Sequence, residues 1–151
     1  MIPIKFIPFI YAILFAIIMI AVVPRAEIRR LSIYGILFGA VADVIVVVFG
    51  VLTGSFSYIN YEELGLFGLH FFAPISWALF FIIYFYFLPK LRIYQYIYTF
   101  SAVFYSMMFC QMISKLGVLK LTHGIIDSII PFVIWIPLAT WGFLKIEKTD
   151  R

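Results

Sequence analysis

One acidic side chain, Asp43, lies inside a long apolar stretch of the sequence. It is the only charged residue between positions 33 and 53. An ionisable group at the middle of a membrane helix costs about 2.5 to 3.5 kcal/mol on insertion scales, so it has to face protein or water. Asp43 is therefore a candidate site for a proton, a cation or a polar ligand. The alternative is a protonated carboxyl group that only hydrogen-bonds to a neighbouring helix.

Asp43 shares one helical face with four glycines. At about 100° per residue, the five residues fall within an arc of about 100°. Pairs of glycines four residues apart let the backbone of another helix approach closely, which is a common means of helix packing in lipid. We expect this face to pack against a helix. The glycines are Gly35, Gly39, Gly50 and Gly54.

A second polar group comprises His70, His123 and Asp127. His123 and Asp127 are four residues apart, so they project from the same face if both are helical. Two imidazoles and a carboxylate could bind a divalent metal or form a proton relay, with Glu62 and Glu63 nearby in the chain. Alternatively the histidines are simply solvated and Asp127 is a first-turn acid favoured by the helix dipole. The identity of any metal or cofactor stays open.

Aromatic side chains recur at helical spacing in the second half of the chain. Such stripes either line a cleft for a lipophilic ligand or pack helices together. They include Trp77, Tyr84, Tyr98 and Tyr105. The sequence has no phosphate-binding Gly-Lys-Ser/Thr loop, no His-Glu-x-x-His pair and no Gly-x-Ser-x-Gly elbow, so nucleotide hydrolysis and the common hydrolase chemistries are not expected.

The elements that must position these residues are apolar and long. Hydrophobic residues make up 66% of the chain, charged residues only 12%, and the mean hydropathy is +1.15, whereas a soluble domain carries about 25% charged residues. Runs of roughly 20 apolar residues recur, which is the length that spans a bilayer. We predict an all-α, polytopic membrane protein, with 1–151 forming one integral membrane domain. The five predicted transmembrane helices cover about 4–23, 33–53, 66–88, 94–114 and 125–144.

The basic residues predict an orientation, because cytoplasmic loops close to membrane ends are rich in Lys and Arg. With five spans, eight basic residues fall on one side and three on the other. The N-terminus is therefore predicted outside and the C-terminus inside. The net charge of +4 comes from short clusters between apolar runs, so no nucleic-acid partner is expected. The larger group is Arg25, Arg29, Arg30, Lys90, Arg92, Lys145, Lys148 and Arg151.

Residues 30–92 resemble small multi-pass membrane proteins of spore-forming Firmicutes. The likeness is carried by Gly35-Ile-Leu-Phe-Gly39-Ala-Val-Ala-Asp43, Phe49-Gly50, Pro74-Ile-Ser-Trp77 and Phe87-Leu88-Pro89. It implies a location in the bacterial cytoplasmic membrane and no particular activity. The stretch from Gly39 to Asp43 is also similar to the rod-shape-determining MreD proteins, a resemblance that implies a scaffold role.

Three functions are compatible with these observations. The first is a non-enzymatic scaffold or subunit that packs its glycine face against another membrane protein or a second copy of itself. The second is a small ion- or proton-coupled transporter or channel subunit that uses Asp43. The third is a membrane enzyme acting on a lipid or isoprenoid. The sequence favours a non-enzymatic role, with the lipid bilayer as the first partner.

Overall fold

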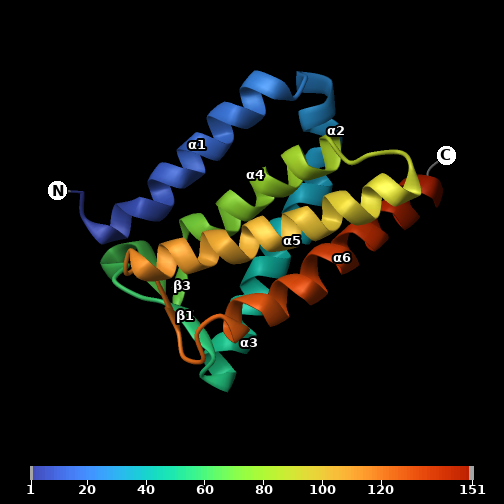
Figure 1. Ribbon diagram of the computed structural model, residues 1–151. Coiled ribbons are helices and arrows are strands. Elements are labelled where there is room, and N and C mark those ends of the chain that lie inside the picture. The colour runs from blue at the N-terminus through green and yellow to red at the C-terminus, as the bar shows by residue number, and fades with distance from the viewer. Residues whose placement is uncertain (1, 150–151) are drawn as a thin grey trace.

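The computed structural model describes residues 2–149. Its helices form five rods joined by short connections, as Figure 1 shows. The first rod is a 3-10 turn, Ile4–Phe6, followed by α1, Ile7–Val22. The second consists of α2, a π-helical segment and α3. The remaining rods are α4, Phe72–Tyr86, α5, Arg92–Lys115, and α6, Ile126–Thr149.

The second rod is longer than the predicted helix 33–53. It begins with α2, Arg25–Gly35, continues through the π-helical segment Ile36–Val41, and ends with α3, Ala42–Thr53. Pro24 precedes its first turn, a position where the missing proline N–H costs nothing. Gly54 ends it in the left-handed conformation, with φ of 71°. The basic residues from Arg25 to Arg30 therefore lie in helical turns, not in the loop expected from sequence.

The third rod is shorter than the predicted helix 66–88. Gly65–Leu66 (β2) and Leu69–His70 (β3) form an antiparallel hairpin ahead of it. The two turn residues, Phe67 and Gly68, both have positive φ, as a tight two-residue hairpin turn requires. The 15 residues of α4 span about 22 Å at 1.5 Å per residue, which is less than a bilayer core.

Four helices are long and apolar enough to cross a membrane by length and composition, and α4 is a shorter apolar helix. The four are Ile4–Val22, Arg25–Thr53, Arg92–Lys115 and Ile126–Lys148. Many large apolar side chains on their outer faces are exposed, among them Ile20, Leu52 and Phe100. A soluble monomer rarely carries so much exposed apolar surface. The structure is therefore mostly helical and compatible with a membrane protein.

The rods run back and forth between two ends of the bundle (Figure 1). The N-terminal end holds the start of α1, the small strands and the start of α6. The C-terminal end holds the turn between α1 and α2, the turn before α5 and the C-terminal part of α6. The central helix is α4, which packs against α1, α2 and the π-helical segment, while α6 packs on α5.

A second pair of strands closes the N-terminal end. Phe56–Tyr58 (β1) pairs antiparallel with Leu119–Leu121 (β4). The Thr122 hydroxyl also donates to the Gly54 carbonyl oxygen at 2.6 Å. These bonds join the loop after α3 to the loop before α6 and point Tyr58 into the core, where it is 5% exposed. The two segments that carry Asp43 and Asp127 are thereby fixed relative to each other.

Candidate functional site

Asp43 is buried inside the bundle. It lies in the first turn of α3, directly after the π-helical segment, and is 3% exposed. Its Oδ2 atom is fully buried and has no hydrogen-bond partner among the described residues. Leaving a buried polar group unpaired costs about 1 to 3 kcal/mol, and more when it is charged. Unsatisfied buried polar atoms are rare in folded proteins, so this atom is a candidate for binding a ligand. Short π-helical segments also occur often at functional sites.

A small cavity of about 30 Å³ lies beside Asp43. This volume is enough for a single water molecule or an ion of that size. Its walls are mostly aromatic and aliphatic, with five side chains that carry polar or ionisable groups. These are Asp43, Tyr58, Cys110, Asp127 and Ser128. Two acids from different helices therefore line the same small space.

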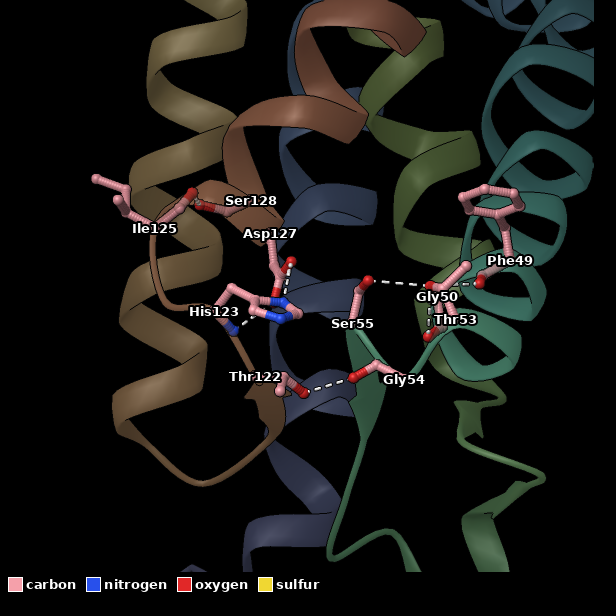
Figure 2. Close-up of polar contacts among 10 residues, drawn as sticks. All are labelled: Phe49, Gly50, Thr53, Gly54, Ser55, Thr122, His123, Ile125, Asp127 and Ser128. Carbon is pink, nitrogen blue, oxygen red and sulfur yellow. Dashed lines mark hydrogen bonds and ion pairs between the residues drawn. The ribbon is translucent and has the colours of Figure 1, made fainter.

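Asp127 connects this cavity to the surface through His123. The backbone N–H of His123 donates to Asp127 Oδ2 at 2.6 Å, and His123 Nδ1 lies 3.2 Å from both carboxylate oxygens. The Asp127 side chain is 7% exposed and the His123 side chain 61%. Figure 2 shows the pair at the start of α6, across from Ser55 and Thr53. The structure thus brings together two of the three residues grouped from sequence.

His70 occupies a different place. Its Nε2 lies 2.8 Å from the Lys5 carbonyl oxygen, and its Nδ1 accepts a hydrogen bond from the backbone N–H of Phe72 at 3.1 Å. The ring is therefore neutral, with the proton on Nε2. Burial lowers the pKa of His70 below its ordinary value. Both ring nitrogens are engaged with backbone groups, so His70 secures the N-terminal end and does not face His123.

Glu62 and Glu63 face Lys5 and not the histidines. The Lys5 ammonium lies 2.9 Å from Glu62 Oε2 and 2.7 Å from Glu63 Oε1. The hydrogen bond from Lys5 lowers the pKa of Glu63. Within residues 2–149 no three His, Cys, Asp or Glu side chains are placed to hold a metal ion together. The expected grouping of Glu62, Glu63 and both histidines is therefore not seen.

The glycine face of the second rod is covered by helix α4 of the same chain. A Cβ atom on Gly39 would lie 2.5 Å from the Trp77 carbonyl oxygen, and one on Gly35 would lie 2.6 Å from the Ile82 side chain. Gly50 abuts the Phe56 ring in the same way. A Cβ atom added to Gly54 would meet no described atom within 4 Å, and this glycine instead ends α3. Another protein would find the Gly35 and Gly39 positions already occupied.

Several residues of the site gave no signal in the sequence. Tyr58 reaches the cavity only because β1 pairs with β4. Burial raises the pKa of Tyr58 well above its ordinary value, and the nearby groups of Tyr11 and Asp43 raise it further. Tyr58 therefore stays a neutral hydroxyl group. Trp135 donates from Nε1 to the Phe38 carbonyl oxygen at 2.7 Å, which ties α6 to the π-helical segment.

Two larger clefts flank the bundle. One, of about 520 Å³, lies among α1, α4 and α5 and is lined by the aromatic stripes noted in the sequence, including Trp77, Tyr84 and Tyr98. The other, of about 560 Å³, lies between α3 and α6 and reaches Asp127. Both volumes are typical of ligand-sized pockets. The aromatic stripes thus serve both packing and the wall of a cleft.

Comparison with protein-family models, with curated proteins and with solved structures gives no match to this chain. The features of this chain that bear on function are therefore Asp43, Asp127 and the cavity that both residues line.

Proposed function

We propose that this chain is a proton- or ion-coupled membrane subunit in which Asp43 binds and releases the transported ion. The observation that carries the proposal is the buried Asp43 Oδ2 atom, which has no hydrogen-bond partner within residues 2–149 and borders a small cavity. A structural aspartate would be expected to satisfy both oxygens inside the protein. Asp127 and His123 supply a polar connection from this cavity to the N-terminal end.

We further propose that the chain resides in a bacterial cytoplasmic membrane and crosses it five times, with α4 as the short central crossing. The N-terminus would lie outside and the C-terminus inside. The concentration of Arg and Lys at the C-terminal end supports this orientation. The placement of α4 among longer helices supports its crossing, because α4 packs against α1, α2 and the π-helical segment.

The scaffold function expected from sequence remains a prediction. Its proposed contact surface was the glycine face, which α4 covers at Gly35 and Gly39. A homo-oligomer or a complex with another membrane protein would therefore have to use a different face. This is why the coupled-ion function is preferred.

The test is proton flux in proteoliposomes that contain an entrapped pH-sensitive dye. Asp43→Asn keeps the side chain's shape and removes its charge, so we expect it to reduce flux to the level of empty vesicles. Glu62→Gln is the matched control, since it neutralises an exposed acid and leaves Glu63 to bind Lys5. Wild-type flux in Asp43→Asn, with an unchanged elution profile, would rule out the proposal.

A further inference from the structure

The cleft between α3 and α6 has the shape of a site for a chain-like molecule with a polar head. Most of its wall is aliphatic or aromatic, as at Ile45, Phe49 and Leu138. Its polar groups, Thr53, Ser55 and Asp127, come from the start of α6 and from the end of α3 and the loop after it. Figure 2 shows Asp127 directed toward His123 at the start of α6, and Ser55 directed toward Thr53 on the facing element.

The cleft adjoins the cavity beside Asp43. Asp127, Pro131 and Trp135 line both spaces, as do Val46 and Phe56. A molecule lying in the cleft therefore has its polar end next to the cavity and its apolar part along α3 and α6. This arrangement places the head of such a molecule within reach of the unpaired Asp43 oxygen.

The carboxyl groups of the two spaces favour a cationic head. Asp43 and Asp127 line them, and no Lys or Arg of the described residues does. The exposed His123 ring lies against Asp127, with Nδ1 3.2 Å from both carboxylate oxygens. In a surrounding of low dielectric constant, two carboxyl groups stabilise a cation and disfavour an anion. The indole of Trp135 adds an aromatic wall of the kind that attracts cations.

The unpaired Asp43 oxygen restricts the head further. This acceptor can bind a head group that carries an N–H donor, as a primary ammonium does, and not a trimethylammonium group, which has none. A primary ammonium has three N–H donors. Asp43 Oδ2 has no hydrogen-bond partner among the described residues and can accept from one of them. The Asp127 carboxylate also lines the cavity but already accepts from the His123 backbone N–H, and the Ser128 hydroxyl already accepts from Gln111 Nε2.

We propose that the α3–α6 cleft and the Asp43 cavity together bind a single-chain primary alkylamine, with the ammonium group between Asp43 and Asp127. This inference rests on the proposed function, because the amine is the substrate class that would exchange with a proton at Asp43. The exchange balances: a protonated Asp43 carboxyl group gives up its proton to solvent when the ammonium ion binds beside the resulting carboxylate. Binding should therefore release about one proton per amine.

The apolar chain itself contributes little selectivity. In a bilayer, transfer from lipid tails to an apolar cleft gains little, since lipid is as apolar as the cleft wall. The discrimination among ligands with the same chain must therefore come from the head group. This makes a set of compounds with one chain and different heads the decisive probe.

The experiment uses the full chain in nanodiscs, with Trp135 as the single tryptophan after Trp77→Phe and Trp141→Phe. The probe is 6-bromohexylamine, whose bromine stays near enough to the head group to quench an indole beside the cavity. The same chain carrying a trimethylammonium or a carboxylate head provides the two comparison ligands. We expect saturable quenching by the amine and affinities at least about tenfold weaker for the other two, the scale of one lost charged hydrogen bond.

The variants separate this inference from the proposed function. Asp43→Asn and Asp127→Asn should each weaken amine binding by about 10- to 100-fold, while Ser101→Ala in the other cleft should not change it. Equal quenching by all three bromo compounds, or amine affinity unchanged in both aspartate variants, would refute the amine site even if Asp43-dependent proton flux is found. Amine binding that both aspartate variants weaken, together with no proton flux in the wild-type protein, would instead support the binding site and refute the transport function.

Discussion

At the scale of single residues, Asp43 and His70 illustrate two opposite ways to bury an ionisable side chain. His70 uses both ring nitrogens on backbone groups of Lys5 and Phe72 and has nothing left to offer a ligand. Asp43 keeps an oxygen without a partner. The sequence pattern identified both residues as candidates. Only their hydrogen bonds show that His70 has a structural role, while Asp43 remains a candidate binding residue.

The state of His70 predicts how stability changes with pH. Because burial lowers its pKa, the folded protein binds a proton at His70 less readily than the unfolded chain. The neutral His70 ring contributes its full share to the free energy of unfolding above the ordinary histidine pKa of about 6.5. This contribution is lost as the pH falls below that value toward the lower pKa of the folded protein. It amounts to about 1.4 kcal/mol for each unit by which the folded-state pKa lies below the unfolded-state pKa. Thermal unfolding in detergent between pH 8 and pH 5 should show a lower Tm at acid pH.

The comparison variant is His70→Phe, which cannot titrate. Its Tm should be lower than that of wild type at pH 8, because two hydrogen bonds are lost, but the fall between pH 7 and pH 5 should be smaller. If His70→Phe shows the same pH slope as wild type, another group controls the acid sensitivity.

At the scale of helices and strands, hydropathy predicted where long helices occur but not how they begin and end. The apolar run that starts at Leu66 gave no sign that its first residues form a hairpin, because a short apolar run looks the same in a strand and in a buried helix. The positive φ of Phe67 is also invisible in its residue type. The cavity was equally hidden, since it depends on pairing between residues as distant as Phe56 and Leu121.

The contact between the second rod and α4 predicts an unusual effect of a small substitution. Gly39→Ala introduces a better helix former, and this effect alone would raise the free energy of unfolding by up to about 1 kcal/mol. Its Cβ atom would, however, meet backbone atoms of Trp77 and Ala78 that cannot turn aside. We expect a net loss of about 1 to 3 kcal/mol in the free energy of unfolding, the scale of overpacking a tight core.

Gly142→Ala in α6 is the matched control for that prediction. There the added Cβ atom would meet the Phe38 ring at 3.0 Å, and a side chain can shift where a backbone cannot. Denaturation in mixed micelles should therefore show a smaller change for Gly142→Ala. A Gly39→Ala protein as stable as wild type would mean that the second rod and α4 are less closely packed than described.

At the scale of the whole molecule, the two ends of the bundle differ in charge and in closure. The N-terminal end is held by the Lys5 ion pairs and by the β1–β4 pairing. At the C-terminal end, Arg30 forms ion pairs with Glu27 of α2 and Glu147 of α6. The side carrying more basic charge is the one proposed to face the cytoplasm.

Single-cysteine labelling tests both the orientation and the crossing of α4. In a Cys110→Ala background, Glu62→Cys and Lys120→Cys should react with a membrane-impermeant maleimide in intact cells. Lys90→Cys should react only after permeabilisation. All three positions are exposed. The reverse pattern would invert the proposed orientation, and identical labelling of positions 62 and 90 would show that α4 does not cross.

The residues that line the Asp43 cavity are translated at different times, and this order has a consequence for biosynthesis. In the proposed membrane location, Asp43 would be inserted early, whereas Cys110, Asp127 and Trp135, which line the cavity beside it, are translated later. Until α6 packs against the other helices, the carboxyl group would lack part of its cover. A polypeptide truncated before residue 126 should therefore be degraded faster than the full-length chain, and Asp43→Asn should reduce that difference.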